Sequence, residues 1–426
     1  MKRLLWNART LIILVLTLLP AAGLAGGRSG SIMLLQQPDG AILLRASSIL
    51  DGRGGVLTDR DIVVNDGRIE AIRAAGQGHG EVVYDLGELT LLPGLIDTHV
   101  HIGWHFDRTG KTPSRTVEET PAESILYAAE NAWLTLMGGV TTVQSLGAPA
   151  DAELRTAIGR GTLPGPRILT SLRSLSERTG SPQEIRSRVR ELAEQGADVI
   201  KIFASASIRD GGGPTMTQEQ LDAACGEAKA RGLRAVVHAH GPESARRATL
   251  AGCTSIEHGA LLDRATLEVM AAHGIFYDPN IDLVFRNYFE NEEHFLGVGN
   301  YTKKGFEQMR KAVPSALRVF KEALTVPGLR IVFGTDAVAG SHGRNYQELV
   351  YRSRVGGQPA MDTIVSATSL AAESLGLVDE IGTIATGMAA DIIGTAGDPS
   401  RDIDALGKVR FVMKGGKVYR NDPARR

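Results

Sequence analysis

The segment Leu95-Ile96-Asp97-Thr98-His99-Val100-His101-Ile102 is a short apolar run that carries polar residues toward its end. Seven comparable runs follow it, and the eight lie at residues 95–102, 140–146, 167–171, 198–204, 234–240, 255–259, 275–277 and 330–336. Helical patterns fall between or after them, at residues 182–195, 218–231, 263–272 and 345–354 among others. This alternation favours a parallel sheet, and eight units predict a (β/α)8 TIM barrel over residues 93–376.

A doubly wound open sheet is the alternative architecture for the same alternation. It is disfavoured because no Gly-x-Gly-x-x-Gly motif follows an early strand. Residues 283–328, between the seventh and eighth runs, are rich in Asn, Glu, Lys and aromatic residues and are longer than a normal connection. We therefore expect a helical insertion there, near the functional site.

Both ends of the chain have a different texture, with short strands of alternating apolar and polar residues separated by turns. The turn Asn65-Asp66-Gly67 between two such runs is a hairpin signal. Neither end alone has enough strands to bury a core. We therefore predict one small, β-sandwich-like domain made of residues 28–92 plus 377–424.

The composition is that of an ordinary globular protein, with 43% apolar and 22% charged residues among 426. Lys and Arg number 47 against 48 Asp and Glu, which gives a net charge of −1. Because the chain has no excess of positive charge to bind phosphates, nucleic acid is disfavoured as a partner. The two cysteines, Cys225 and Cys253, lie in a helical pattern and in a turn, so no disulfide framework is expected.

Residues 1–25 have the features of a secretory signal peptide. Three basic residues precede an apolar run at residues 11–19, and small residues extend to Ala25, after which cleavage is expected. An uncleaved membrane anchor is the alternative, but the apolar run is short for a membrane span and is followed by Pro20. The expectation is a periplasmic or secreted protein with no membrane attachment after cleavage.

The first candidate site residues are a histidine pair. His99 and His101 are two residues apart in the first run, so both side chains leave the same face of a strand. Two imidazoles that converge inside a barrel form a natural metal chelate. The same spacing also occurs for ordinary surface or core histidines, so the pair needs further ligands to be convincing.

Lys201 lies in the fourth run, on the same face as Val199 and Phe203. An isolated ammonium group inside a barrel is costly. One resolution is loss of the proton, followed by reaction of the neutral amine with carbon dioxide to give a carbamate that can bridge two metals. The other is an ordinary ion pair with an acid that the sequence does not reveal.

Three further runs end in residues that commonly bind metals. His238 and His240 close the fifth run, His258 closes the sixth and Asp336 closes the eighth. Five of the eight runs thus carry nitrogen or oxygen ligands, on the face where barrel active sites form. Imidazole and carboxylate without sulfur favour zinc, with manganese, iron or cobalt as alternatives.

As an ordered set, these motifs resemble the amidohydrolase superfamily, most of all its imidazolonepropionase-like and prolidase-like branch of metal-dependent hydrolases. The resemblance extends over residues 41–422 and rests on Pro93-Gly94-Leu95-Ile96-Asp97-Thr98-His99-Val100-His101, Lys201-Ile202-Phe203-Ala204-Ser205, His238-Ala239-His240-Gly241, Ile256-Glu257-His258-Gly259, Gly334-Thr335-Asp336 and Gly387-Met388-Ala389-Ala390-Asp391-Ile392. The last motif is similar to the family's Gly-Lys-x-Ala-Asp-Leu ending, with Met388 in place of lysine.

The resemblance implies a centre of two divalent metal ions, with zinc expected. The buried metal would be held by His99, His101 and Asp336, and the outer metal by His238 and His258. Lys201, carboxylated on its side-chain nitrogen, would bridge the two ions. Tentative substrate contacts are His240, His105, His342 and Arg344, although a helix beginning at Asn345 would also explain the last two.

The resemblance also implies hydrolysis of a carbon–nitrogen bond by a hydroxide held between the metals, with Asp336 as the catalytic proton carrier. Deamination is disfavoured because His240 and Gly241 stand where deaminases carry an acid. Dipeptides or N-acyl amino acids are the expected substrates. A cyclic amide, lactone or carbamate substrate, or a catalytically silent binding protein, are the alternatives, and a homo-oligomer is left open.

Overall fold

The computed structural model describes residues 40–112 and 119–422. The predicted signal peptide at residues 1–25 lies outside the described residues. Within the described part of the chain, no helix is both long and apolar enough to cross a membrane.

Parallel strands form the larger part of the structure, and a strand overlaps each of the eight runs that the sequence predicts. They pair in two sheets, in which every pairing is parallel. The first sheet contains β6 (Leu95–Val100), β7 (Val140–Ser145) and β8 (Arg167–Thr170). The second contains β9 (Ser174–Leu175), β10 (Val199–Phe203), β11 (Arg234–Ala239), β12 (Ser255–His258), β13 (Phe276–Asp278) and β14 (Arg330–Ile331).

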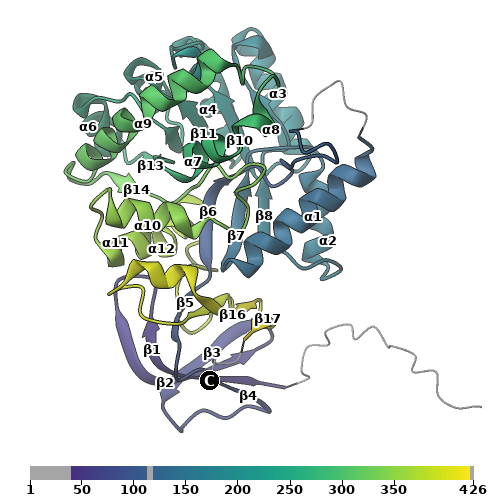
Figure 1. Cartoon of the computed structure of the whole chain (residues 1–426), viewed down its shortest axis with the longest axis vertical. Helices are drawn as coiled ribbons and strands as arrows, with labels where there is room; N and C mark the ends of the chain where they lie inside the picture. The colour runs from purple at the N-terminus through teal and green to yellow at the C-terminus, as the bar shows by residue number, and fades with distance from the viewer. Residues whose placement is uncertain (1–39, 113–118, 423–426) are drawn as a thin grey trace, which may run out of the picture. The chain divides into compact units, whose positions relative to one another are not determined.

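Helices follow most of these strands and lie around the outside of them (Figure 1). They are α1 (Pro121–Met137), α2 (Asp151–Gly159), α3 (Pro182–Glu194), α4 (Gln218–Ala230), α5 (Pro242–Leu250), α6 (Arg264–Ala272), α10 (Tyr346–Arg354), α11 (Ala360–Ser366) and α12 (Ser369–Ser374). The expected insertion is helical and consists of α7 (Leu283–Glu290), α8 (Glu292–Phe295) and α9 (Lys303–Ala323). Three short 3-10 helices are η1 (Glu177–Thr179), η2 (Ile208–Asp210) and η3 (Ile403–Gly407).

Several helix starts are encoded locally. In α3, the side chain of Ser181 accepts a hydrogen bond from the backbone of Glu184, whose side chain accepts one from the backbone of Ser181. Pro182 occupies the first turn, where a missing N–H has no cost. The same capping box begins α1 and α4. Local sequence therefore fixes where these helices leave the strand ends.

The two parallel sheets approach each other through backbone hydrogen bonds rather than through one closed ladder. The amide of Asp198 donates to the carbonyl of Thr170 at 2.8 Å on one side. On the other side, the amide of Thr98 donates to the carbonyl of Phe333 at 2.9 Å. This mixed α/β arrangement is consistent with the predicted barrel, but the described strands do not form a single closed sheet.

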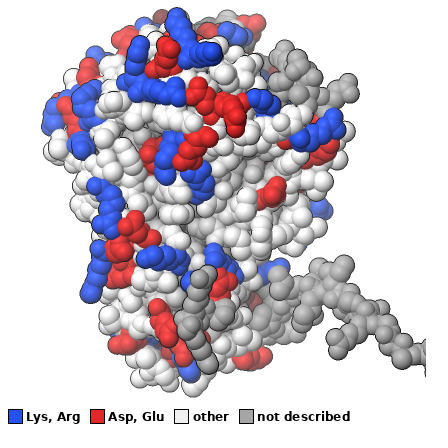
Figure 2. Space-filling view, viewed as in Figure 1, with Lys and Arg blue, Asp and Glu red and all other residues white. Residues whose placement is uncertain are grey.

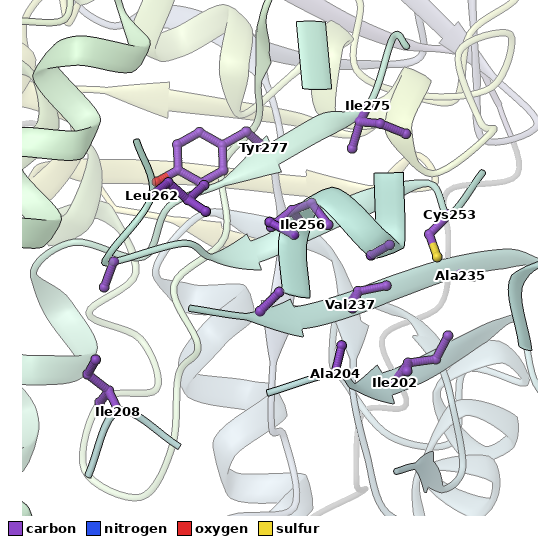
Figure 3. Packing of buried hydrophobic residues seen from close by; sticks show 14 of the residues in the cluster. Ile202, Ala204, Ile208, Ala235, Val237, Cys253, Ile256, Leu262, Ile275 and Tyr277 are labelled. Atoms are coloured by element: carbon purple, nitrogen blue, oxygen red, sulfur yellow. The ribbon is translucent and has the colours of Figure 1, made fainter. Parts of the chain in front are cut away.

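Successive side chains along the parallel strands point to opposite faces, and both faces are buried. Ile202, Val237 and Ile256 come from three neighbouring strands and pack into the largest apolar cluster together with helix residues (Figure 3). Val199 and Val236, on the other strand face, form a small separate cluster with Leu146. The first face holds the helices in place, and the second leads to the candidate site.

Both ends of the chain contribute to one further sheet, the purple and yellow strands of Figure 1. Its order is β17-β16-β15-β5-β1-β2-β3, with β4 also paired to β1. The bounds are β1 (Ile42–Leu50), β2 (Val56–Asn65), β3 (Arg68–Ala74), β4 (Val82–Asp85), β5 (Thr90–Pro93), β15 (Ile392–Thr395), β16 (Val409–Lys414) and β17 (Lys417–Asn421). The predicted hairpin turn is present between β2 and β3, where Asp66 and Gly67 both have positive φ.

Backbone pairing and side-chain packing both join the two chain ends. The C-terminal strand β15 pairs antiparallel with β5, so the strands of both ends belong to one hydrogen-bonded sheet. Ile42 and Leu44 of β1 share one apolar cluster with Phe411 and Met413 of β16. The sandwich-like packing of this sheet and the boundaries of a separate domain stay predictions.

The expectation that the cysteines form no disulfide is wrong. Cys225 of α4 and Cys253, in the turn before β12, form a disulfide, with their Cα atoms 5.1 Å apart. The two residues are 28 positions apart in sequence, and only the packing of α4 beside the turn before β12 brings them together. Cys253 lies at the edge of the apolar cluster in Figure 3.

Charges are mixed on the surface. Figure 2 shows Lys and Arg interleaved with Asp and Glu on the face in view, in agreement with the near-zero net charge. Many of these side chains pair along one helix turn, such as Arg264 with Glu268 on α6 at 2.8 Å. Exposed pairs of this kind contribute little to stability.

Candidate active site

A cavity of about 680 Å³, including its open mouth, lies at the carboxyl ends of the parallel strands. All six residues predicted as metal ligands line it, and so does His240. The remaining lining residues are Trp104, Phe203, Ser207, Ile208, Arg209, Val284, Phe285, Tyr288, Tyr301, Met309 and Val338. The structure therefore brings together side chains from separate strand ends.

The histidine pair that closes the first run meets the carboxylate that follows β14. Oδ1 of Asp336 lies 3.1 Å from Nε2 of His101 and 3.4 Å from Nε2 of His99. The amide of Asp336 donates to the carbonyl of His99 at 2.7 Å, which fixes the carboxylate beside both rings. Burial opposes ionisation of Asp336, but His99 and His101 outweigh it and lower the pKa of this carboxyl below its usual value.

Lys201 is buried and lies next to the same pair. Its Nζ is 3.5 Å from Nε2 of His99 and 5.5 Å from the centre of the Phe203 ring. Burial lowers the pKa of this amine, which favours the neutral form. Among the described residues, no carboxylate lies within ion-pair distance of Lys201, and the charges of Glu257, Asp336 and Asp278 offset the effect of burial only in part.

Three histidine rings form another side of the cavity. The ring centres of His238 and His258 are 4.6 Å apart, and His240 lies 4.6 Å from His238 and 5.0 Å from His258. Burial lowers the pKa of His238 and His258 well below the usual value, and burial together with Arg209 lowers the pKa of His240 to about 3. Neutral imidazoles offer a lone pair to a metal.

The backbone of His240 is fixed by a hydrogen bond, whereas one nitrogen of its ring has no partner in the described part of the chain. Its backbone amide donates to Oγ of Ser205 at 3.1 Å, which fixes the end of β11. Its Nδ1 is buried and has no hydrogen-bond partner among the described residues. An unpaired buried ring nitrogen that lines a cavity is suited to contact a ligand.

The sequence-based prediction missed the residue that orients His99. Oε2 of Glu257 lies 2.8 Å from Nδ1 of His99, and Oε1 of the same carboxylate accepts from Ser255 at 2.5 Å. With Nδ1 bound in this way, Nε2 of His99 faces the cavity, beside Asp336 and Lys201, where it can bind a metal. Glu257 lies on the same strand face as Ser255, so period-two alternation along β12 could have identified it.

Behind Glu257 lies a fully buried network of charges. Arg352 of α10 contacts Glu348 at 3.2 Å and Asp278, the last residue of β13, at 3.4 Å. Glu348 in turn accepts hydrogen bonds from the backbone amides at residues 281–283. The predicted seventh run stopped one residue short of Asp278, which is why this carboxylate was missed.

A second network supports the end of the eighth run. Asp97 accepts hydrogen bonds from Oγ1 of Thr335 at 2.6 Å and from Nδ2 of Asn345 at 2.7 Å. Burial raises the pKa of Asp97 to about 7. The helix α10 begins directly after Asn345, as the sequence-based alternative expects, but Asn345 does not cap it through its side chain. It ties β6 to the segment that carries Asp336 instead.

Three tentative substrate contacts do not line the cavity. His105 contacts Glu119 at 3.0 Å and stacks on Tyr127 at 4.3 Å. His342 lies 3.2 Å from the carbonyl of Trp104. Arg344 pairs with Glu290 at 2.7 Å. Each of these side chains already has a protein partner, which explains its position outside the lining.

An aromatic part of the cavity wall was not predicted. Arg209 lies on η2, with its guanidinium carbon 4.0 Å from the ring centre of Tyr301 and 5.7 Å from that of Tyr288. The two tyrosine hydroxyls hydrogen-bond to each other at 2.9 Å. These residues come from a loop and from the helical insertion, where no periodic pattern marks a site.

The donor set fits divalent metal ions. Ligand atoms of His99, His258 and Asp336 all lie within 4.8 Å of one another. Neutral imidazoles and an ionised carboxylate are the ligands that zinc and similar metals prefer. The lowered pKa values of these groups give them the protonation states that metal binding requires.

Comparisons with known proteins point in the same direction. A family model described as "Amidohydrolase family" matches residues 90–419. The chain is 28% identical to "Ochratoxinase" of Aspergillus niger over 374 residues, which cover 78% of this chain and 75% of that protein. It is also 26% identical to "Imidazolonepropionase" of Rhizobium meliloti, over 86% of this chain and 93% of that protein.

A solved structure gives a comparable match. The structure of a Xaa-Pro dipeptidase with bound methionine in the active site superimposes with a TM-score of 0.81 and 31% sequence identity. The match covers 89% of this chain and 100% of that chain. The predicted resemblance to a prolidase-like and imidazolonepropionase-like branch is thereby confirmed.

Proposed function

Because this chain belongs to the amidohydrolase family, we propose that it is an exported, metal-dependent hydrolase that cleaves the amide bond of dipeptides or N-acyl amino acids. The observation that carries the proposal is the meeting of six ligand-type side chains in one cavity. A catalytically silent binding protein would have no need to retain the full set.

We assign the buried metal to His99, His101 and Asp336, and the outer metal to His238 and His258. Lys201, as a carbamate, would help to hold both ions. Two divalent ions, with zinc preferred, supply the acidity that activates water and the charge that polarises a carbonyl. The amine of Lys201 is buried beside Nε2 of His99 and its pKa is lowered, and both observations support the carbamate.

Asp336 is the group that moves the proton. Its pKa is lowered, so the carboxylate is ionised near neutral pH and can accept a proton at an oxygen. Its position beside the histidine pair, on the cavity lining, lets it pass that proton to the leaving nitrogen of the amide. His99 is held in one orientation by Glu257 throughout this transfer.

The substrate class rests on likeness and on the cavity. The solved relative at 31% identity is a Xaa-Pro dipeptidase, and we extend its substrate type to this chain. The cavity wall combines apolar and aromatic side chains with a few polar groups, as small-molecule sites commonly do. The apolar residues Val284, Phe285 and Met309 would surround the substrate's side chain.

Export is supported by two independent features. Residues 1–25 have the pattern of a signal peptide. The disulfide between Cys225 and Cys253 is typical of proteins that fold in an oxidising compartment. We therefore propose that the mature protein is periplasmic or secreted.

The decisive experiment measures metal content and turnover together. The purified mature protein should contain close to two divalent ions per chain by elemental analysis and should hydrolyse members of a panel of dipeptides and N-acyl amino acids. Removal of the metals by chelation should abolish turnover, and zinc should restore it. Active protein without metal would refute the proposal, and turnover only of cyclic amides, lactones or carbamates would replace its substrate class.

A further inference from the structure

Arg209 is held in a fixed orientation on the wall of the cavity. Its Nε donates to Oδ1 of Asn300 at 2.9 Å, and its guanidinium lies over the ring of Tyr301. Tyr288 and Tyr301 are both buried and hydrogen-bonded to each other. The side chain is therefore already ordered before any ligand arrives, which reduces the entropy lost on binding.

The positive charge of Arg209 lacks a carboxylate partner among the described residues. Other arginines near the insertion are paired, since Arg286 contacts Asp282 and Arg310 contacts Glu292. The acid next to Arg209 in sequence, Asp210, accepts a hydrogen bond from Asn300 at 2.6 Å instead. A partly buried guanidinium without a counter-ion, facing a cavity, is suited to an anionic ligand.

We propose that Arg209 binds the free carboxylate of the substrate's leaving amino acid and thereby selects substrates with an unblocked C-terminus. The inference rests on the proposed amide hydrolysis at the same site. A guanidinium presents two parallel N–H groups that match the two oxygens of a carboxylate. The amide bond of the same substrate would then lie toward the histidines and Asp336, which line the cavity together with Arg209.

The chemistry of the wall favours a carboxylate over a phosphate. Arg209 is the one arginine among the described lining residues, and tyrosines and apolar side chains surround it. A single monovalent cation balances a carboxylate, whereas a doubly charged phosphate would normally be met by several donors. His240, with its unpaired Nδ1, lies near both Arg209 and the other histidines and can contact the substrate close to the scissile bond.

The first test uses the wild-type holoenzyme and two matched probes. The dipeptide that the panel shows to be cleaved best is compared with the same dipeptide carrying a C-terminal amide. We expect kcat/KM to be about 10- to 100-fold higher for the free carboxylate, the range of a charge-assisted hydrogen bond. Equal values for both probes would overturn the inference while leaving the proposed function intact.

The second test uses Arg209→Met and the milder Arg209→Lys. Arg209→Met should lose the preference for the carboxylate, so that the ratio of kcat/KM for the free dipeptide to kcat/KM for its amide falls to roughly 1–3. Arg209→Lys should retain part of the preference, because lysine keeps the positive charge but lacks the two parallel N–H groups of a guanidinium. Equal losses on both probes would mean that Arg209 only supports the wall and would overturn the inference.

Arg310→Met is the matched control. Arg310 also lies over an aromatic ring, that of Phe289 at 5.0 Å, but it pairs with Glu292 and does not line the cavity. For Arg310→Met, the ratio of kcat/KM for the free dipeptide to kcat/KM for its amide should equal that of wild type. A wild-type protein that hydrolyses neither probe nor any member of the panel would refute the proposed function itself. If Arg209→Met folds poorly, the wild-type ratio and Arg209→Lys decide the matter.

Discussion

Glu257 allows the structure to predict a metal affinity from a residue that touches no metal in the proposed centre. Its carboxylate binds Nδ1 of His99 at 2.8 Å and thereby directs Nε2 toward the cavity. Glu257→Gln keeps the size and one acceptor oxygen but removes the charge. Hydrogen bonds to charged groups contribute roughly 1 kcal/mol more than neutral ones, which corresponds to about a fivefold loss in affinity for the buried metal.

Glu257→Ala removes the acceptor entirely and leaves the buried Nδ1 of His99 without a partner. Such an unpaired group costs about 1–3 kcal/mol, so the loss of metal affinity should rise to roughly 10- to 100-fold. The assay is titration of the holoenzyme with a competing chelator, with bound metal measured by elemental analysis and folding followed by circular dichroism.

Glu268→Gln on α6 is the control, because Glu268 is exposed and pairs only with Arg264 among the described residues. It should release metal at the same chelator concentration as wild type. The reasoning is refuted if Glu257→Gln and Glu257→Ala retain metal as firmly as this control, since orientation of His99 would then contribute nothing to binding.

Four further results are expected. Lys201→Ala should fold, lose at least one metal and nearly all turnover, and regain part of both with a small carboxylic acid, whereas full activity would exclude the bridge. Asp336→Asn should keep its metals largely bound but lose roughly 10²- to 10⁴-fold in rate. Because activity requires the ionised carboxylate, the wild-type rate should fall as the pH drops through the lowered pKa of Asp336, and the variant should lack this acidic limb. Replacing Cys225 and Cys253 together by alanine should lower the free energy of unfolding by about 3–4 kcal/mol, the value for closing a loop of this length, and reduction of wild type should have a similar effect in thermal unfolding. Arg352→Met should destabilise the fold by roughly 3–5 kcal/mol in denaturant titrations, because it leaves two buried carboxylates unpaired.

The sequence predicted the parts of the site that depend on strand periodicity. His99 and His101 share a strand face because alternate side chains point the same way, and His238, His258 and Asp336 follow because parallel strands end at one edge. Each of these positions is set by local geometry and by strand direction. The structure needed only to bring the strand ends together.

Residues that depend on contacts between distant elements could not be predicted in this way. Cys225 and Cys253 meet because α4 packs beside the turn before β12, and nothing local to either residue reveals that contact. The same limit applies to Asn345, whose side chain binds Asp97 rather than capping its own helix. Local pattern indicated that the two chain ends would pair, but the particular edges that meet, β15 against β5, depend on the whole fold.

The two halves of the cavity therefore differ in how they are specified. The histidine half comes from strand ends, whose direction is fixed by the parallel sheets, and its residue types follow from the chemistry of a metal site. Arg209, Tyr288 and Tyr301 come from η2 and from the insertion, which can change in length or sequence without disturbing the strands. If Arg209 selects the substrate carboxylate, as the geometry indicates, specificity can change through this wall while the bond-breaking residues stay in place.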